Sequence, residues 1–342
     1  MSAAIERQTR NADGRITRRN LLLSVPALML APTVLPRAAM VQTGMPPIVT
    51  RRLNNVMISV SDLKRSVEFY QGLFGAPVQQ GGVAVFRIGA GPHFFALTQV
   101  TGTAKPDFLS YGLTVDHFDP DALLKTLVGL GVAGAKATAR DGTPELWAPD
   151  PDGISIQLQH TAYGRGSGRH GEVLPTSPKS TAKPAFQLKS LSHVTLTVTN
   201  GPRSKEFYTK VLGLRPQAMQ ASTACMALGS GPDFIAIPTT ANNPNAKAGV
   251  NHVCFAIDGF DPNRVMGILA QHGLEPIEYG VAAAIKPLTC RTRLRQRSNN
   301  GGGPTHPLGT PELYFNDPDN ITIQIQDVKY CGGSGALGEI CP

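Results

Sequence analysis

Two stretches of the chain alternate between apolar and polar residues with a period of two. In residues 191–198 a histidine and two threonines share one face, while two valines and a leucine share the other. This alternation predicts a strand with one face in a core and the other toward a polar space. Residues 53–60 show the same pattern, with Asn55 in the place of His193, 138 residues earlier. The chain therefore contains two copies of one unit.

The segments that follow these strands repeat as well. Copy one has a helix start at Ser61-Asp62 and a predicted helix through Phe69-Tyr70 to Gly75. Copy two carries Phe207-Tyr208 on a helix predicted to end at Gly213. In both copies a Phe-Asp-Pro segment then opens a second predicted helix. Each copy closes with Thr-Pro-Glu-Leu, an Asp-Pro-Asp turn and a strand of alternating pattern. The pattern predicts an α+β fold.

Composition shifts suggest boundaries for these parts. We expect an export signal over 1–40, a linker over 41–50, copy one over 51–160, a linker over 161–187, copy two over 188–328 and a Cys/Gly tail over 329–342. The offset between the copies grows from 142 to 167 before Thr310, which predicts an insertion over about 280–306. The insertion is rich in arginine and glycine, and we interpret it as a basic loop.

The N-terminus resembles a twin-arginine export signal. Arg18 and Arg19 precede an apolar run that reaches about Pro36, which is too short and too interrupted by proline to span a bilayer. The resemblance implies a periplasmic or secreted protein without a stable membrane anchor. The alternative is a disordered basic tail.

Charge and cysteine usage add two further expectations. The net charge of +8 falls to +4 without the first 40 residues, which hold six arginines and two acids. This mild excess gives no case for nucleic-acid binding. Cys331 and Cys341 flank a glycine-rich segment, so that a disulfide between them is plausible in an oxidising compartment. Two free thiols are the alternative. No pattern specifies an oligomeric state.

A first strand of the form Leu-x-His-Val and a closing strand after Asp-Pro-Asp-Gly resemble the glyoxalase, bleomycin-resistance and extradiol-dioxygenase superfamily, also called vicinal oxygen chelate (VOC) proteins. The resemblance covers residues 51–160 and 188–328. It implies two tandem modules, each built of paired βαβββ units whose curled mixed sheet surrounds a cleft. It does not fix the reaction, because the superfamily includes lyases, isomerases, dioxygenases and binding proteins.

The resemblance also implies a metal site in copy two. The family's ligands are a His on the first strand, a His on the strand before the second helix, and a Glu on the last strand; these positions hold His193, His252 and Gln324. Copy one has Asn55, Ser110 and Gln157 there, which are poor ligands. Two histidines suit Fe, Mn, Zn, Ni or Co. A glutamine in place of the carboxylate leaves the ion more positive, and two hydrogen-bonded histidines in a metal-free cleft remain the alternative.

Three functions follow from this resemblance. The first is a metal-dependent lyase or isomerase acting on a small oxygen-rich substrate. The second is an extradiol dioxygenase, in which His306 would be the acid–base residue and Tyr314 would hydrogen-bond the substrate. In the alternative for these two residues, His306 is a loop residue and Tyr314 a cleft-wall aromatic. The third function is a metal-free protein that binds a small molecule.

Overall fold

A computed structural model describes residues 48–174, 183–281, 284–295 and 309–341. All of them belong to one compact unit, residues 40–342. The expected export signal and His306 lie outside the described residues. No helix among the described residues is long and apolar enough to cross a membrane.

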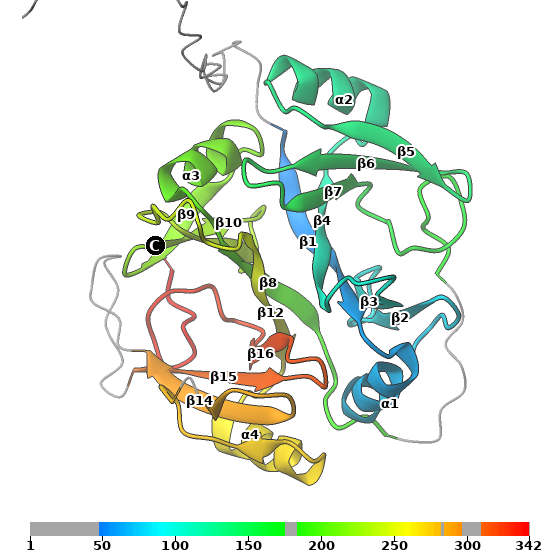
Figure 1. The fold of residues 1–342 in the computed structure, drawn as a ribbon. Helices are drawn as coiled ribbons and strands as arrows, with labels where there is room; N and C mark the ends of the chain where they lie inside the picture. The colour runs from blue at the N-terminus through cyan, green and yellow to red at the C-terminus, as the bar shows by residue number, and fades with distance from the viewer. Residues whose placement is uncertain (1–47, 175–182, 282–283, 296–308, 342) are drawn as a thin grey trace, which may run out of the picture. The chain divides into compact units, whose positions relative to one another are not determined.

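Module 1 is one curled mixed sheet with two helices (Figure 1). Its elements are β1 (Thr50–Val60), α1 (Leu63–Phe74), β2 (Val83–Arg87), β3 (Phe94–Gln99), β4 (Asp107–Val115), α2 (Pro120–Gly129), β5 (Lys136–Arg140), β6 (Thr143–Pro149) and β7 (Ser155–Gln159). The strand order is β2-β3-β1-β4-β7-β6-β5, with β1 antiparallel to β4 and parallel to β3. The first strand after α1 is reduced to a single bridge between Gln79 and Val85.

Module 2 repeats this plan with its own strands. Its elements are β8 (Ser190–Thr197), α3 (Gly201–Lys210), β9 (Arg215–Gln220), β10 (Thr223–Ala227), β11 (Phe234–Pro238), β12 (Gly249–Ile257), α4 (Pro262–Gln271), β13 (Glu275–Pro276), β14 (Thr289–Arg295), β15 (Thr310–Asn316) and β16 (Thr322–Asp327). The strand order is β13-β14-β15-β16-β12-β8-β11-β10-β9. The prediction of two tandem modules with curled mixed sheets is confirmed.

The helix starts follow from the capping residues. Asp62 caps α1 by accepting a hydrogen bond from the Arg65 backbone N–H, and Gly75 follows the helix with φ 92°. Asp119 and Asp261 cap α2 and α4 ahead of a proline at the first helical position. The predicted end at Gly213 is wrong by a few residues, because α3 ends at Lys210 and a buried turn follows.

The two modules contact each other through reciprocal pairs. The Tyr70 hydroxyl of α1 donates to Asp317 at 3.0 Å, and the Tyr208 hydroxyl of α3 donates to Asp150 at 3.2 Å. Both carboxyls are buried, and burial raises the pKa of each to about 6. The Phe-Tyr helix of each module thus hydrogen-bonds to the Asp-Pro-Asp turn of the other. Buried apolar residues of both modules belong to one cluster.

A glycine-rich loop follows the last strand of each module, and the first of the two loops corrects an expected boundary. Residues 163–173 and 330–340 form equivalent loops, closed by a bridge between Ser167 and Val173 in one and between Ser334 and Ile340 in the other. The segment 163–173 therefore packs as part of module 1 and is not the start of a linker. Residues 330–340 form the corresponding loop of module 2. The predicted disulfide is confirmed, because Cys331 is bonded to Cys341.

The expected basic loop also needs correction, because the part of it over Thr289–Arg295 is a strand, β14. Arg291, Arg293 and Arg295 lie on β14, which pairs antiparallel with β15 and places Arg293 opposite Glu312. The pairing of Arg295 with Thr310 matches that of Arg140 with Thr143 in module 1. The inserted residues are therefore split between the segments before and after β14.

Candidate functional site

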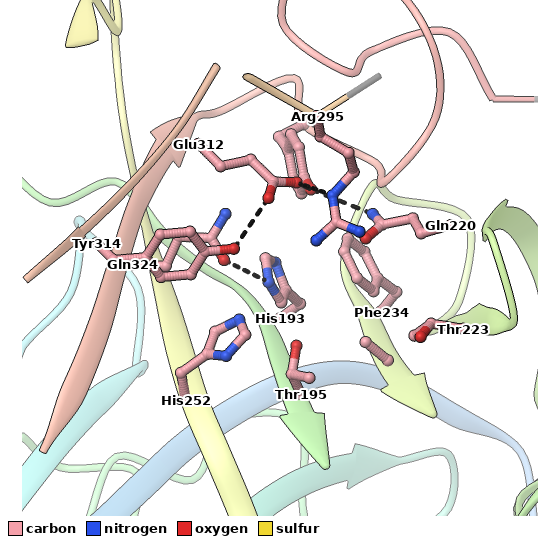
Figure 2. A pocket seen from close by; sticks show the side chains of 12 residues that line it. His193, Thr195, Gln220, Thr223, Phe234, His252, Arg295, Glu312, Tyr314 and Gln324 are labelled. Carbon is pink, nitrogen blue, oxygen red and sulfur yellow. Dashed lines mark hydrogen bonds and ion pairs between the residues drawn. The ribbon is translucent and has the colours of Figure 1, made fainter. Parts of the chain in front are cut away.

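A small cavity opens on the concave side of the module 2 sheet (Figure 2). Its volume is about 60 Å³. The lining residues come from strands β8, β9, β10, β11, β12, β14, β15 and β16 and from the loop after β16: His193, Thr195, Gln220, Thr223, Phe234, Ala236, His252, Arg295, Glu312, Tyr314, Gln324 and Tyr330. All three residues predicted as metal ligands therefore line one cavity.

The register of the sheet brings these ligands together. β12 lies between β8 and β16, and Cys254 on β12 is opposite both His193 and Gln324. His252 precedes Cys254 by two residues, so that its side chain projects from the same face. His193 Nε2 is 3.1 Å from Gln324 Oε1, and the two imidazole rings stand edge to face at 5.6 Å between centroids.

Each imidazole has its Nδ1 atom held by the preceding residue. His193 Nδ1 is 3.2 Å from the Ser192 hydroxyl, and His252 Nδ1 is 2.8 Å from Asn251 Oδ1. An amide oxygen accepts only, so that His252 Nδ1 carries the proton and Nε2 is the basic atom. Burial lowers the pKa of His252 to about 4, which keeps this ring neutral near pH 7.

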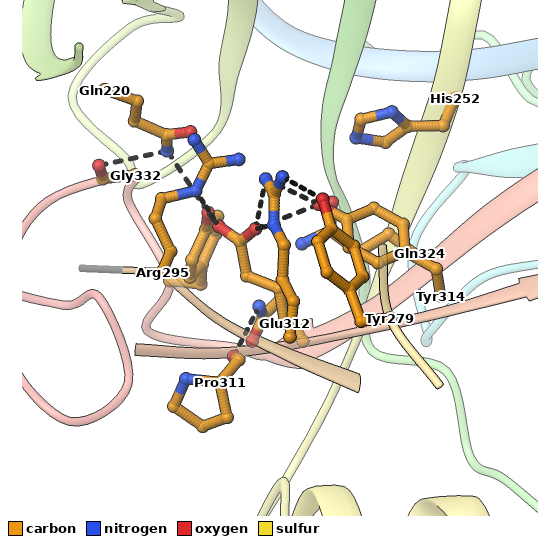
Figure 3. Close-up of polar contacts among 12 residues, drawn as sticks. Gln220, His252, Tyr279, Arg295, Pro311, Glu312, Tyr314, Gln324 and Gly332 are labelled. Atoms are coloured by element: carbon orange, nitrogen blue, oxygen red, sulfur yellow. Dashed lines mark hydrogen bonds and ion pairs between the residues drawn. The ribbon is translucent and has the colours of Figure 1, made fainter. Parts of the chain in front are cut away.

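A buried carboxylate that the sequence analysis did not select, Glu312 on β15, organises one side of the cavity (Figure 3). Its Oε2 accepts from Arg293 Nε at 2.7 Å and from the Tyr314 hydroxyl at 2.9 Å. Its Oε1 accepts from Arg295 Nε at 2.7 Å and from the Tyr330 hydroxyl at 2.8 Å. Burial acts to lower the pKa of Arg293, but the attraction of Glu312 outweighs it and the pKa is raised.

Tyr314, predicted to contact the substrate, has its hydroxyl committed to this cluster. The hydroxyl donates to Glu312 and lies 3.3 Å from Arg293 Nη2, while the ring stands edge to face with His252 at 5.3 Å. Burial and the charge of Glu312 raise the pKa of Tyr314 well above 10, so that it remains a phenol. Its position next to His252 places it at the wall of the cleft.

Module 1 carries the same cluster without the histidines. Glu145 accepts from Arg140 Nε at 3.1 Å and from the Tyr163 hydroxyl at 3.0 Å, as Glu312 does from Arg295 and Tyr330. The sheet registers place Asn55, Ser110 and Gln157 at the positions of His193, His252 and Gln324. Asn55 Nδ2 instead bonds to Asn54 Oδ1 and Gln159 Oε1.

Two signals in the sequence could have identified the missed residues. Arg291, Arg293 and Arg295 alternate with period two, which is the pattern of a strand face. Tyr163 and Tyr330 stand at the same offset, 167, as the two Thr-Pro-Glu-Leu segments, which indicates a repeated Tyr–Glu pair.

The donors suit one divalent ion in type, and the one donor pair in contact, His193 and Gln324, suits it in spacing. Two ligands at right angles, each about 2.1 Å from an ion, are about 3 Å apart, as His193 Nε2 and Gln324 Oε1 are. Metal-binding histidines usually have their other ring nitrogen held by a neighbour, as both are here. Within the described ranges no group of three His, Cys, Asp or Glu is placed to hold a metal, so that such a site depends on the Gln324 amide oxygen.

Comparisons with known proteins agree with this architecture. The model of the Glyoxalase/Bleomycin resistance protein/Dioxygenase superfamily matches residues 52–158 and 190–275. The chain matches none of the curated proteins.

Solved structures share the fold at low sequence identity. The Mn(II)-bound glyoxalase from Novosphingobium aromaticivorans has a TM-score of 0.57 and 19% identity, over 81% of this chain and 82% of that one. A variant of homoprotocatechuate 2,3-dioxygenase from B. fuscum has a TM-score of 0.54 and 18% identity, over 83% and 73%. An extradiol ring-cleaving dioxygenase from B. fuscum has a TM-score of 0.52 and 17% identity, over 82% and 73%. With its family model matched in both modules, the chain belongs to the Glyoxalase/Bleomycin resistance protein/Dioxygenase superfamily.

Proposed function

We propose that module 2 is a metal-dependent enzyme site of lyase or isomerase type, acting on a small substrate that chelates through neighbouring oxygens. His193, His252 and Gln324 would hold one divalent ion, whose chemistry when bound is that of a Lewis acid. The observation that carries the proposal is the convergence of these three side chains on one cavity, with both Nδ1 atoms already held by neighbours.

The surrounding side chains prepare the cleft for such a substrate. Phe234 stacks on His193 at 4.3 Å between ring centroids, which fixes the imidazole and closes the cavity on its apolar side. Glu312 holds Tyr314 and Tyr330 in place through hydrogen bonds from both hydroxyls. These contacts restrict the cavity to about 60 Å³.

Metal titration of matched variants tests this proposal. The parent is expected to bind about one Zn²⁺ or Mn²⁺ per chain, and His193→Ala or His252→Ala to abolish binding. Asn55→Ala and Ser110→Ala are the matched controls, because they alter the corresponding positions of module 1 and are expected to leave the stoichiometry unchanged. Gln324→Glu is expected to raise the affinity by adding a negative ligand. Two ions per parent chain, or full binding by His193→Ala, would refute the site.

A metal-free binding protein is the second candidate, and one observation favours it. The contact between His193 Nε2 and Gln324 Oε1 is also satisfied as a hydrogen bond if that nitrogen carries the proton. Absence of metal from protein purified in its native compartment, together with no uptake on titration, would support this alternative. Oxygen uptake with catechols would instead favour the dioxygenase.

We also propose that the protein is exported by the twin-arginine route to the periplasm or beyond. The disulfide between Cys331 and Cys341 supports this, since disulfides persist in oxidising compartments. Replacing Arg18 and Arg19 together by lysine is expected to retain the protein in the cytoplasm, as measured by cell fractionation. Unchanged export of the double variant would remove the twin-arginine assignment.

A further inference from the structure

We infer that the ligand of the module 2 cleft is a small carboxylate whose charged end is bound by Arg295. This inference rests on the proposed function, because it names the substrate class of the same site. It follows from how the guanidinium of Arg295 is held, from the charge balance of the cavity wall and from the neutral character of the three metal donors.

Arg295 is anchored by one atom and presents the rest of its guanidinium to the cavity. Its Nε donates to Glu312 Oε1, which fixes the plane of the group. Among the described residues, neither Nη atom of Arg295 donates to a protein acceptor, and Figure 2 shows both on the cavity side, between Gln220 and His193. The two Nη atoms form the fork that binds carboxylates with two parallel hydrogen bonds.

The neighbouring Arg293 shows the contrast. Its Nε and Nη2 atoms both bond to Glu312, at 2.7 and 2.6 Å, and its Nη1 donates to the Tyr279 hydroxyl at 2.6 Å. Every nitrogen of the Arg293 guanidinium therefore bonds within the protein, whereas Arg295, on the same strand face, has its Nη donors available for a ligand.

The charges along this wall do not cancel. Among the described residues of this wall, three arginines of β14 stand beside one carboxylate, that of Glu312. Arg291, which is buried, is paired with the neutral Asn316 through Nη1 at 2.6 Å. The wall therefore carries an excess of positive charge in a partly desolvated place, which favours an anion.

The donors at the other end of the cavity point to the same ligand class. His193, His252 and Gln324 bring no negative charge to a bound cation. A ligand carboxylate adjacent to a second oxygen would supply that charge at the ion and also meet the fork of Arg295. Binding of the cation and binding of the carboxylate are then expected to strengthen each other by the same factor.

Calorimetric titration with two probes of matched shape tests this inference. Pyruvate and pyruvamide both carry neighbouring oxygens and differ by a carboxylate oxygen against a neutral amide NH₂. Each is titrated into EDTA-treated protein and into protein with one equivalent of Zn²⁺. Pyruvate is expected to bind the parent more tightly than pyruvamide, and Zn²⁺ to increase the difference. Arg295→Gln is expected to lower pyruvate affinity by about tenfold or more and to change that of pyruvamide far less.

Two further variants complete the test. Arg140→Gln alters the corresponding arginine of module 1 and is expected to leave pyruvate binding unchanged, while Arg295→Lys, which keeps the charge without the fork, is expected to lie between parent and Arg295→Gln. Equal parental affinities for the two probes, or full pyruvate binding by folded Arg295→Gln, would overturn the inference. Zn²⁺ stoichiometry, measured separately, tests the proposed metal site. If the parent binds Zn²⁺ but shows no preference for pyruvate over the neutral probe, only the inference is refuted. If pyruvate binding depends on Arg295 although no Zn²⁺ binds, only the metal site is refuted.

Discussion

Replacing Glu312 by glutamine tests whether this carboxylate holds the wall of the module 2 cleft. The substitution keeps the shape of the side chain and removes its charge. The side chain is fully buried, and both carboxylate oxygens are occupied, one by Arg293 and Tyr314 and the other by Arg295 and Tyr330. A neutral amide would turn a donor group toward at least one of these donors.

The size of the effect follows from the two charges that lose their partner. The side chains of Arg293 and Arg295 are each 24% exposed, so that water compensates only part of the loss. Removing one partner of a buried charged cluster costs about 3–5 kcal/mol, and the residual exposure places Glu312→Gln at the lower end, about 3 kcal/mol.

Module 1 provides the matched control. Glu145 accepts from one arginine, Arg140, and one phenol, Tyr163, and Arg140 also has Asp141 as a partner. Glu145→Gln therefore leaves one partly compensated charge and is expected to cost about 1–2 kcal/mol. Urea denaturation of parent and both variants, compared at equal slope, measures the difference.

A clear outcome would refute this reasoning. If Glu312→Gln lowers the free energy of unfolding by less than about 1 kcal/mol, or by no more than Glu145→Gln, the Arg–Glu cluster does not stabilise the fold as described.

Three further predictions concern the rest of the molecule. Burial raises the pKa of Asp150 and Asp317 to about 6, so that the folded state holds protons that the unfolded state releases. Their contribution to stability is greatest below about pH 4 and is lost as the pH rises to 6. The double variant Asp150→Asn/Asp317→Asn is expected to flatten this part of the curve of unfolding free energy against pH. Replacing Cys331 and Cys341 by serine is expected to cost about 2–3 kcal/mol by chain entropy, measured by thermal unfolding, whereas an unchanged melting temperature would contradict the estimate. Gly332→Ala is expected to destabilise more than Gly102→Ala in the same assay, because both glycines have positive φ but only at Gly332 would a Cβ lie 2.5 Å from Cys225 Sγ.

The sequence predicts the framework of this fold well because the framework depends on local signals. Period-two alternation predicts a polar strand face for His193, the family resemblance selects His252, and the structure brings both to one cavity. Asp-Pro segments marked the starts of α2 and α4 at the correct residues. Such signals depend on neighbours in the chain and do not require knowledge of distant contacts.

The rest of the site depends on pairing between distant segments, which local composition obscures. Arg293 and Arg295 stand in an insertion whose glycines suggest a loop, although their alternation fits a strand opposite Glu312. Tyr330 stands in a glycine-rich segment that resembles a tail, although its hydroxyl reaches the same carboxylate. The disulfide of this segment could be predicted from its two cysteines, but the backbone hydrogen bonds that order the segment are not revealed by composition.

Comparing the modules separates the parts of the site that maintain the fold from those that carry chemistry. The cluster of arginine, glutamate and tyrosine occurs in both modules, at Glu145 and at Glu312, and the glycine-rich loop that positions the tyrosine occurs in both as well. A feature present in both clefts cannot by itself explain a function assigned to one. The glutamate and tyrosine of the cluster are therefore best understood as the wall that fixes the shape of each cleft. What differs is the imidazole pair of module 2, Arg293 in the place of Thr138, and the surroundings of the matched arginines, since Arg140 has Asp141 as a further partner whereas Arg295 presents its Nη atoms to the cavity. These differences combine a neutral metal-donor set with an excess of positive charge. A cation bound by the neutral donors, together with an anion bound near the arginines, matches both features of the site, whereas either ligand alone matches only one.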